Sequence, residues 1–431
     1  MFNAENAIKK WQPILEHKDA APIKDAYRKA VIAKLLENTE NAQREQAQMM
    51  TEAIGGTAQA SATYSDPVLV SLVRRAMPQL IAYDICGVQP MSGPTGLIFA
   101  MKARYNTATP SADIDADNSE ALFDVADNTI SGTGTSPDQG TGKTTVNGES
   151  AITANMGFSI EKNTVTAHTR ALKADYSMEL SQDLKAIHGL DAESELSNIL
   201  SQEILSEINR EVLYQIRYNA VLGADQNGVS TPGTFDLVAD ADGRWALERF
   251  QSLLFQIDLE ANQIFKNTRR GKGNWAVVNS DVASALAATG KLDSTGVGSN
   301  INSDYAGNTL IGSIGAMKVY VDPYADAGDV VVGYRGASPF DAGFFSCPYV
   351  PLTMVKTVGE DDFQPKIAFK TRYGVAHNPI INDQSLKPHR DGSDAPAEAA
   401  AFDTGVNNGL LTTGANPYFN RFTVTSINID S

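Results

Sequence analysis

The sequence predicts an α+β protein, in which strands and long helices occupy separate segments. Its 431 residues are 42% apolar, with 34 Gly and 18 Pro, a composition typical of a globular chain with many turns. From Leu97 to Tyr105 apolar and polar residues alternate, which is the pattern of a half-buried strand. From Asp191 to Ile216 apolar residues recur every four positions. This second pattern predicts one helix of about 26 residues, roughly 39 Å long.

The first 52 residues form a charge-rich, mostly helical segment of zero net charge, with 8 basic and 8 acidic residues. Ile23, Tyr27, Val31 and Leu35 give a narrow apolar stripe, so this helix needs a partner. The remaining residues hold 27 basic and 43 acidic side chains, which is the whole net charge of −16. A small-residue linker from Ile54 to Ser65 would be open to a protease. These differences predict two parts with different roles.

A turn rich in Pro and Gly leads into the strand at Leu97. Leu97, Phe99 and Met101 share one face of that strand, and Lys102 and Arg104 fall on the other. We expect the apolar face to be buried and the basic face to be open.

A long polar excursion follows the strand, from 106 to 155, rich in Asp, Ser, Thr, Gly and Asn. We expect an exposed hairpin here, with strand character returning from Phe158 to Leu172. From Gly233 helix-like and strand-like segments alternate, which predicts a compact second domain. The segments that carry this pattern, and the later strands, are Arg244–Phe265, Trp275–Val278, Lys318–Val321, Val330–Tyr334, Val350–Val355, Ile367–Tyr373 and Tyr418–Ile427.

Charge and cysteine content exclude several classes of protein. A net charge of −16 argues against a surface that grips nucleic-acid phosphates. Cys86 and Cys347 lie far apart in apolar settings, which favours buried thiols in a reducing compartment over a disulfide or zinc framework. No apolar run suits a signal peptide or a membrane span, so we expect a soluble protein made inside the cell.

Two loop motifs resemble binding sites and depart from them at essential positions. Residues 137–144 nearly spell a phosphate-binding loop, but Pro137 stands where the first glycine is required. Asp113, Asp115 and Asp117 alternate as in a calcium loop, but Asn118 replaces the turn glycine. Both are better interpreted as solvated loops.

Catalytic pairs are equally weak. Ser159 and Lys162 have the spacing of a Ser/Lys nucleophile pair, yet on an alternating strand they would face opposite sides. The five histidines are scattered, without metal-ligand spacing. We therefore predict no catalytic, cofactor-binding or metal residues and no enzyme activity. A nucleotide-binding or Ser/Lys enzyme is the alternative from another class.

Several blocks of sequence together resemble one family over most of the chain. They occur in the same order as in the major capsid protein of T-even-type tailed phages. These blocks are Val73–Pro78, Asp84–Tyr105, Ala171–Leu190, Glu207–Val212, Leu254–Asp258, Tyr320–Tyr324, and Phe363–Pro365 with Lys370–Gly374.

The resemblance implies the Hong Kong 97-type phage capsid fold. Its parts would be an N-terminal arm, an extended loop, a peripheral domain with a long spine helix, and an axial domain. The insertion subdomain that relatives carry in the extended loop would be reduced. The implied divisions are 1–52, a scaffold-like propeptide that is removed; 53–100, the arm; 101–165, the extended loop; 166–229, the peripheral domain; 230–350, the axial domain; and 351–431, a return to the peripheral domain with a C-terminal segment.

The resemblance also implies a function and partners. The chain would form hexameric capsomers of an icosahedral head around double-stranded DNA, assembled in the host bacterial cytoplasm and kept in the virion capsid. Its partners would be further copies of itself, a vertex capsid paralogue, a prohead protease, an internal scaffold protein and decoration proteins. No cofactor or membrane is implied, and contact with DNA would be weak and non-specific. A pentamer-forming vertex paralogue is the alternative within the same fold.

Two sets of site residues follow from the resemblance. The family carries a Leu/Ile-x-Glu triplet that the prohead protease cuts after the glutamate. Met50, Thr51 and Glu52, followed by Ala53, stand at the matching place, with Met50 similar in volume to the usual residue. Lys102 and Arg104 become candidate contacts with an acidic neighbouring subunit.

Overall fold

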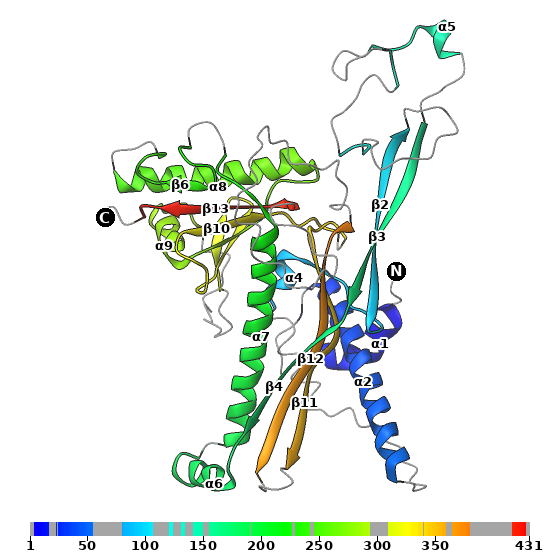
Figure 1. Ribbon diagram of the computed structural model, residues 1–431, viewed down its shortest axis with the longest axis vertical. Coiled ribbons are helices and arrows are strands. Elements are labelled where there is room, and N and C mark those ends of the chain that lie inside the picture. The colour runs from blue at the N-terminus through cyan, green and yellow to red at the C-terminus, as the bar shows by residue number, and fades with distance from the viewer. Residues whose placement is uncertain are drawn as a thin grey trace.

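The computed structural model of the chain describes the following residues: 4–16, 23, 25–54, 80–106, 120–123, 131–133, 141–149, 155–189, 191–225, 229–241, 245–293, 309–338, 340–358, 364–379 and 416–427. Within these parts it contains both helices and strands, so the α+β prediction is confirmed. The body holds two sheets, and a long two-stranded arm projects from it (Figure 1).

The first sheet has four strands in the order β1-β11-β12-β4. The edge strand β1 pairs with β11 in parallel orientation, and the other two pairs are antiparallel. In β12 the odd residues from Ile367 to Tyr373 are buried, and the even ones are half-buried or exposed. One face of this sheet is therefore covered and the other is open. The strands are β1 (Gly87–Val88), β4 (His168–Asp175), β11 (Phe344–Val358) and β12 (Pro365–His377).

Helix α7 (Ala192–Asn219) packs against the covered face through the apolar stripe that the sequence predicted. It begins after Asp191 and carries Glu193 and Glu195 in its first turn, where the helix dipole favours acidic side chains. A short helix, α6 (Met178–Ile187), precedes it. The predicted long helix is confirmed and runs three residues beyond Ile216.

The N-terminal segment forms two helices, α1 (Ala4–Leu15) and α2 (Ala26–Ile54). They share one core cluster with α7 and the first sheet, to which they contribute Trp11, Leu15, Val31, Ile32 and Leu35. The helix with a narrow apolar stripe therefore finds its partner in its own chain. Helix α2 ends at Ile54, the first residue of the predicted linker, and the rest of that linker lies outside the described residues.

The second sheet has seven strands in the order β5-β13-β10-β7-β9-β8, with β6 also on β13. Helices α8 (Ala246–Thr268) and α9 (Ser280–Ala288) contribute to the core beside it. The late strand β13 pairs with β10, although residues 334–415 separate them in the sequence. The strands are β5 (Ala220–Leu222), β6 (Thr234–Asp236), β7 (Trp275–Val278), β8 (Thr309–Ile314), β9 (Met317–Val321), β10 (Asp329–Gly333) and β13 (Asn416–Thr425).

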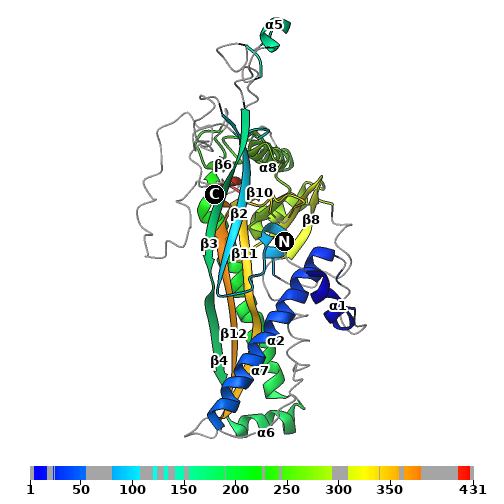
Figure 2. The same ribbon diagram turned by 90° about the vertical axis from the view of Figure 1, so that its right-hand side faces the viewer.

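The projecting arm consists of β2 (Thr95–Asn106) and β3 (Asn155–Thr166), the strands that flank the predicted excursion. They pair in continuous antiparallel register, from Thr95 opposite Thr166 to Asn106 opposite Asn155. Figure 2 shows the arm as a narrow upright ribbon. Short helices α4 (Ala82–Ile85) and α5 (Thr145–Gly148) lie before β2 and within the excursion.

Candidate assembly surfaces

One face of the β2–β3 hairpin is apolar and exposed. Leu97, Phe99 and Met101 on β2 are 53%, 56% and 65% exposed, and Phe158 and Ile160 on β3 are 69% and 70% exposed. The cross-strand register places Met101 opposite Ile160, so these side chains form a strip along the face, with Lys162 beside it opposite Phe99. Twelve residues at about 3.4 Å each make an arm of roughly 40 Å. An exposed apolar strip of this kind is typical of a protein–protein interaction site.

The other face of β2 holds the two basic residues, and the structure reverses the expected burial. Lys102 and Arg104 are 1% and 2% exposed. Arg104 binds Glu161 of β3 at 3.0 Å and donates from Nε to the Ser159 hydroxyl at 3.0 Å. Lys102 lies 3.4 Å from the same Glu161 carboxylate. The expectation of an open basic face was wrong for the single chain, because alternation defines two faces of a strand without specifying which one is covered. Their contact with a neighbouring subunit stays a prediction.

The base of the β2–β3 hairpin packs against the first sheet. Met91 shares a buried cluster with Ile98 of β2 and Val165 of β3. Adding a side chain at Gly96 would bring its Cβ to 3.0 Å from the Met91 side chain, so the start of β2 is tightly packed against the turn before it. The backbone amide of Ala167 also donates to the Pro94 carbonyl at 2.8 Å. The arm therefore extends from a packed base.

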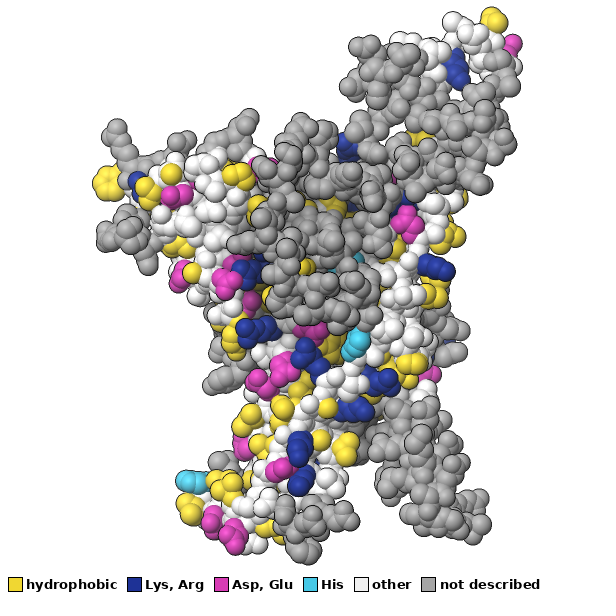
Figure 3. Space-filling model, in the orientation of Figure 1, with side chains coloured by type: hydrophobic (Ala, Val, Ile, Leu, Met, Phe, Trp, Pro, Cys, Tyr) yellow, Lys and Arg dark blue, Asp and Glu magenta, His cyan; other side chains and the backbone are white. Residues whose placement is uncertain are grey.

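The open face of the first sheet carries a group of basic side chains, which we call the basic sheet face. It consists of Lys173 on β4 and Lys366, Lys370 and Arg372 on β12. Lys173 lies 3.7 Å from Asp175, and the other three make no ion pair with another described residue. Figure 3 shows several Lys and Arg side chains over this lower sheet. On a chain with a net charge of −16, this group is a local exception.

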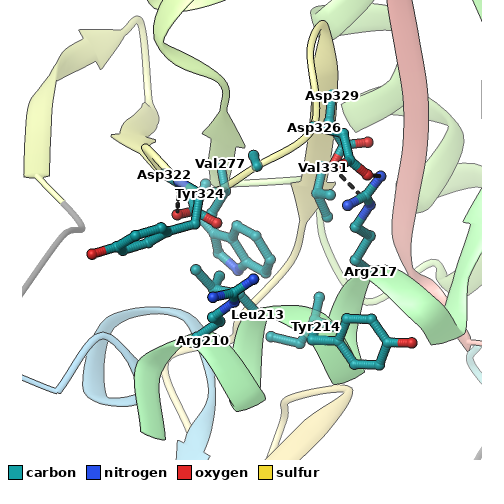
Figure 4. Close-up of a pocket in the computed structure, with 13 residues that line it drawn as sticks. Arg210, Leu213, Tyr214, Arg217, Val277, Asp322, Tyr324, Asp326, Asp329 and Val331 are labelled. Carbon is teal, nitrogen blue, oxygen red and sulfur yellow. Dashed lines mark hydrogen bonds and ion pairs between the residues drawn. The ribbon is translucent and has the colours of Figure 1, made fainter. Parts of the chain in front are cut away.

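A cavity of about 200 Å³ lies where the end of α7 meets the second sheet (Figure 4). Arg217 binds Asp329 at 3.0 Å and Asp326 at 2.5 Å. Burial raises the pKa of the Asp329 carboxyl and of the Asp322 carboxyl. Arg210 lies over the Tyr324 ring, 5.4 Å from its centroid. Because acids and bases are paired across this junction, the arrangement ties α7 to the turn between β9 and β10.

The predicted cleavage residues lie at the end of α2. Met50, Glu52 and Ala53 belong to the last turns of this helix, which ends at Ile54. A helical backbone satisfies its own hydrogen bonds, so this segment would have to unwind to lie extended in a protease site.

The described residues do not bring together the groups that a Ser/Lys or nucleotide-binding enzyme would need. Ser159 and Lys162 lie on opposite faces of β3, with Ser159 half-buried beside Arg104 and Lys162 exposed. Asp113, Asp115 and Asp117 lie outside the described residues, as do residues 137–140 of the loop that resembles a phosphate-binding loop. Among the residues that are described, no group of three His, Cys, Asp or Glu could hold a metal ion, and no helix is long and apolar enough to span a membrane.

Both cysteines are buried and free. Burial raises the pKa of the Cys347 thiol to about 12 and raises that of Cys86 as well. Both therefore behave as apolar core residues, as the sequence predicted.

The fold and these surfaces are typical of a structural subunit. Its most distinctive features are the projecting arm with its apolar strip and the basic sheet face. The family "Major capsid protein Gp23" matches residues 62–424. The chain belongs to this family of phage major capsid proteins.

Individual relatives agree with this assignment. The major capsid protein of Salmonella phage ViI is 37% identical over 88% of this chain and 91% of its own length. That of Enterobacteria phage T4 is 32% identical over 97% of this chain and 98% of its own length. The capsid vertex protein of the same phage is 26% identical over 59% of this chain and 60% of its own.

Solved structures from other phages resemble this chain at low sequence identity. One from Mycobacterium phage Bobi is 9% identical with a TM-score of 0.41, covering 80% of this chain and 90% of that one. The capsid of Myoviridae Phage XM1 is 10% identical with a TM-score of 0.38, covering 80% and 92%.

Proposed function

We propose that this chain forms hexameric capsomers of an icosahedral phage head that encloses double-stranded DNA. Membership of the major capsid protein family supports this function. The observation that carries the assembly step is the apolar strip of the β2–β3 hairpin, which the single chain leaves exposed. Head assembly takes place in the host bacterial cytoplasm, and the finished subunit resides in the virion.

The proposed divisions of the chain follow the family. Residues 101–165 form the extended loop, 166–229 the peripheral domain with α7 as its spine, and 230–350 the axial domain. Residues 53–100 form the N-terminal arm, and 351–431 return to the peripheral domain and form the C-terminal segment. The hairpin, the long helix and the second sheet support this division.

The extended loop of one copy lies on the basic sheet face of another. The excursion from 106 to 155 contains eight acidic residues and one basic residue. The basic sheet face offers charge of the opposite sign on a flat, open surface. Such complementarity specifies the register of a contact and suppresses wrong partners.

A prohead protease removes residues 1–52 by cutting after Glu52. The Met50-Thr51-Glu52 triplet and its position at the end of α2 support this step. An internal scaffold protein and a vertex paralogue are the other partners in assembly, and decoration proteins bind the finished shell. The vertex role itself is less well supported for this chain, since the vertex protein matches over 59% of it at 26% identity.

Assembly of purified protein tests the proposal. We expect electron microscopy and light scattering to detect shells, tubes or hexamers. A stable monomer at high concentration that hydrolyses ATP would overturn the structural role.

A charge-reversal experiment tests the contact between copies. Replacing Lys173, Lys366 and Lys370 by glutamate should weaken assembly, and replacing Asp113, Asp115 and Asp117 by lysine in the same chain should restore it. The control reverses three exposed lysines elsewhere, Lys266, Lys291 and Lys318. Equal loss of assembly in the control would contradict a specific role for the basic sheet face.

A further inference from the structure

Helix α2 contacts the segment from which the hairpin extends, and these contacts are polar and specific. The Tyr27 hydroxyl donates to the Val88 carbonyl, and Arg28 binds the Asp84 carboxylate. Asn38 donates from its amide nitrogen to the Met91 carbonyl at 2.8 Å and to the Tyr349 carbonyl at 3.0 Å. Three side chains of one helix thus hold residues 84–91, which we call the hairpin root.

The same helix covers the hairpin root with apolar side chains. Val31, Ile32 and Leu35 are fully buried in the cluster that includes Tyr83 and Val88. The Arg28 guanidinium also lies over the Tyr83 ring, 5.6 Å from its centroid. Burial raises the pKa of Tyr27 to about 12, so its hydroxyl remains a hydrogen-bond donor at any physiological pH. The contact is therefore a packed interface with satisfied polar groups.

The two ends of the hairpin root differ in the contacts that they make besides those with Tyr27 and Arg28. At the α4 end, Arg335 of the body donates to the Asp84 carbonyl at 3.2 Å and also to the Tyr83 carbonyl. At the β2 end, the amides of Gln89 and Met91 donate to carbonyls of β11 at 2.9 and 3.0 Å. Side-chain support at this end comes from Asn38, whose own side chain is only 7% exposed. Loss of α2 should therefore loosen the β2 end more than the α4 end.

Met91 links this contact to the arm. Its carbonyl accepts from Asn38, and its side chain packs in one cluster with Ile98 and Val165, near the base of β2 and β3. A shift of Met91 therefore moves the packing on which the direction of the arm depends.

We propose that α2 is a clasp on the hairpin root: Tyr27, Arg28 and Asn38 fix the direction of the β2–β3 arm until the N-terminal segment leaves. The release rests on the proposed cleavage after Glu52, whereas the clasp itself is a property of the uncut chain. In the uncut subunit the arm is held at one angle to the body. After release, the arm adjusts its angle to the neighbouring copy.

Hydrogen exchange in the full chain tests the clasp without any cleavage. Asn38→Asp puts a carboxylate in front of two carbonyl oxygens and removes both donated hydrogen bonds. We expect the amides of Gln89 and Met91 to exchange roughly tenfold to a hundredfold faster, the effect of losing one or two buried hydrogen bonds. Tyr27→Phe should give a smaller increase of the same kind. Lys10→Ala, which removes an exposed ion pair with Glu40 in the same helix pair, is the matched control.

A distance measurement tests the consequence for the arm. Spin labels on cysteines at Ile160 and Glu203, both exposed positions, report the angle between the arm and α7. The two native cysteines are buried and should not be labelled. We expect a broader distance distribution in Asn38→Asp than in the unchanged chain, with Lys10→Ala unchanged.

Two results would overturn the clasp. One is unchanged exchange at Gln89 and Met91 in Asn38→Asp. The other is an equal increase across the α7 amides, which would mean general destabilisation. Mass spectrometry of chain from virions decides the cleavage separately, so an intact N-terminus would refute the release and leave the clasp standing.

Discussion

Replacing the apolar strip of the hairpin should abolish assembly and leave the fold intact. The change is Phe99→Thr, Phe158→Thr and Ile160→Thr in one chain, since threonine keeps a high strand propensity. Complete burial of such side chains contributes about 1.5–3 kcal/mol each. They are 56%, 69% and 70% exposed, so covering them would add roughly 1–2 kcal/mol each, or about 3–6 kcal/mol for each hairpin contact.

That free energy corresponds to roughly a hundredfold to ten-thousandfold weaker association for each contact, at about 1.4 kcal/mol per factor of ten. The assay is light scattering over a concentration series, with thermal unfolding followed by circular dichroism. Because the three side chains are exposed in the single chain, unfolding should change by about 0.5 kcal/mol at most for each substitution. The control is Lys162→Gln with Thr164→Ser on the same face of β3. Assembly of the triple variant at the concentration of the unchanged chain would show that the strip does not join the copies. A loss of several kcal/mol of stability would show that these side chains support the fold of the single chain.

Three further predictions concern stability and processing. His377 is fully buried, its ring nitrogens have no hydrogen-bond partner, and burial lowers its pKa to about 4 from 6.5. As the pH falls, this histidine therefore takes up a proton in the unfolded chain before it does so in the folded one. The free energy of unfolding should be at its full value above about pH 6.5 and should fall by about 2 kcal/mol between pH 7 and pH 5, as measured by urea unfolding. His377→Phe should remove most of that slope; a slope unchanged by this substitution would exclude His377 as its source. Arg170 links β4 to Glu207 of α7 at 3.0 Å and to Glu211 at 2.5 Å in a partly solvated setting, so Arg170→Ala should cost about 1 kcal/mol in thermal unfolding, and an unchanged melting temperature would contradict this. Glu52→Gln should leave the N-terminal segment attached in virions, whereas mass spectrometry of the unchanged chain should find a mature subunit that begins at Ala53; a Glu52→Gln chain cut at the same bond would argue against recognition of the glutamate.

Local patterns in the sequence were sufficient to predict the elements themselves. The four-residue apolar spacing predicted α7, and alternation predicted β2, because each pattern reflects the geometry of a single element. The structure confirms both. Resemblance in several ordered blocks gave the family, which the relatives confirm.

What covers each element could not be predicted in the same way. The strand pattern separated Phe99 from Arg104 and did not say that the arginine would be inside, bound to Glu161 of the partner strand. Phe99 lies outward because the surface that would cover it is not part of this chain's own core. A pattern within one strand contains no information about partners that come from another segment or another copy.

The contacts of α2 were missed for a related reason. The stripe of Tyr27, Val31 and Leu35 indicated that the helix needed a partner, but the partner lies next to α7 and β11, far along the sequence. Asn38 gave no signal, because one asparagine in a polar helix is unremarkable until the two carbonyls it binds are known.

A cryo-electron microscopy reconstruction of the assembled particle would show whether this chain is a shell subunit that is joined to its neighbours through the projecting arm. We expect hexamers in which a neighbouring copy covers the apolar strip around Phe158 and Ile160. An ordered shell in which that strip faces solvent on every subunit would contradict it.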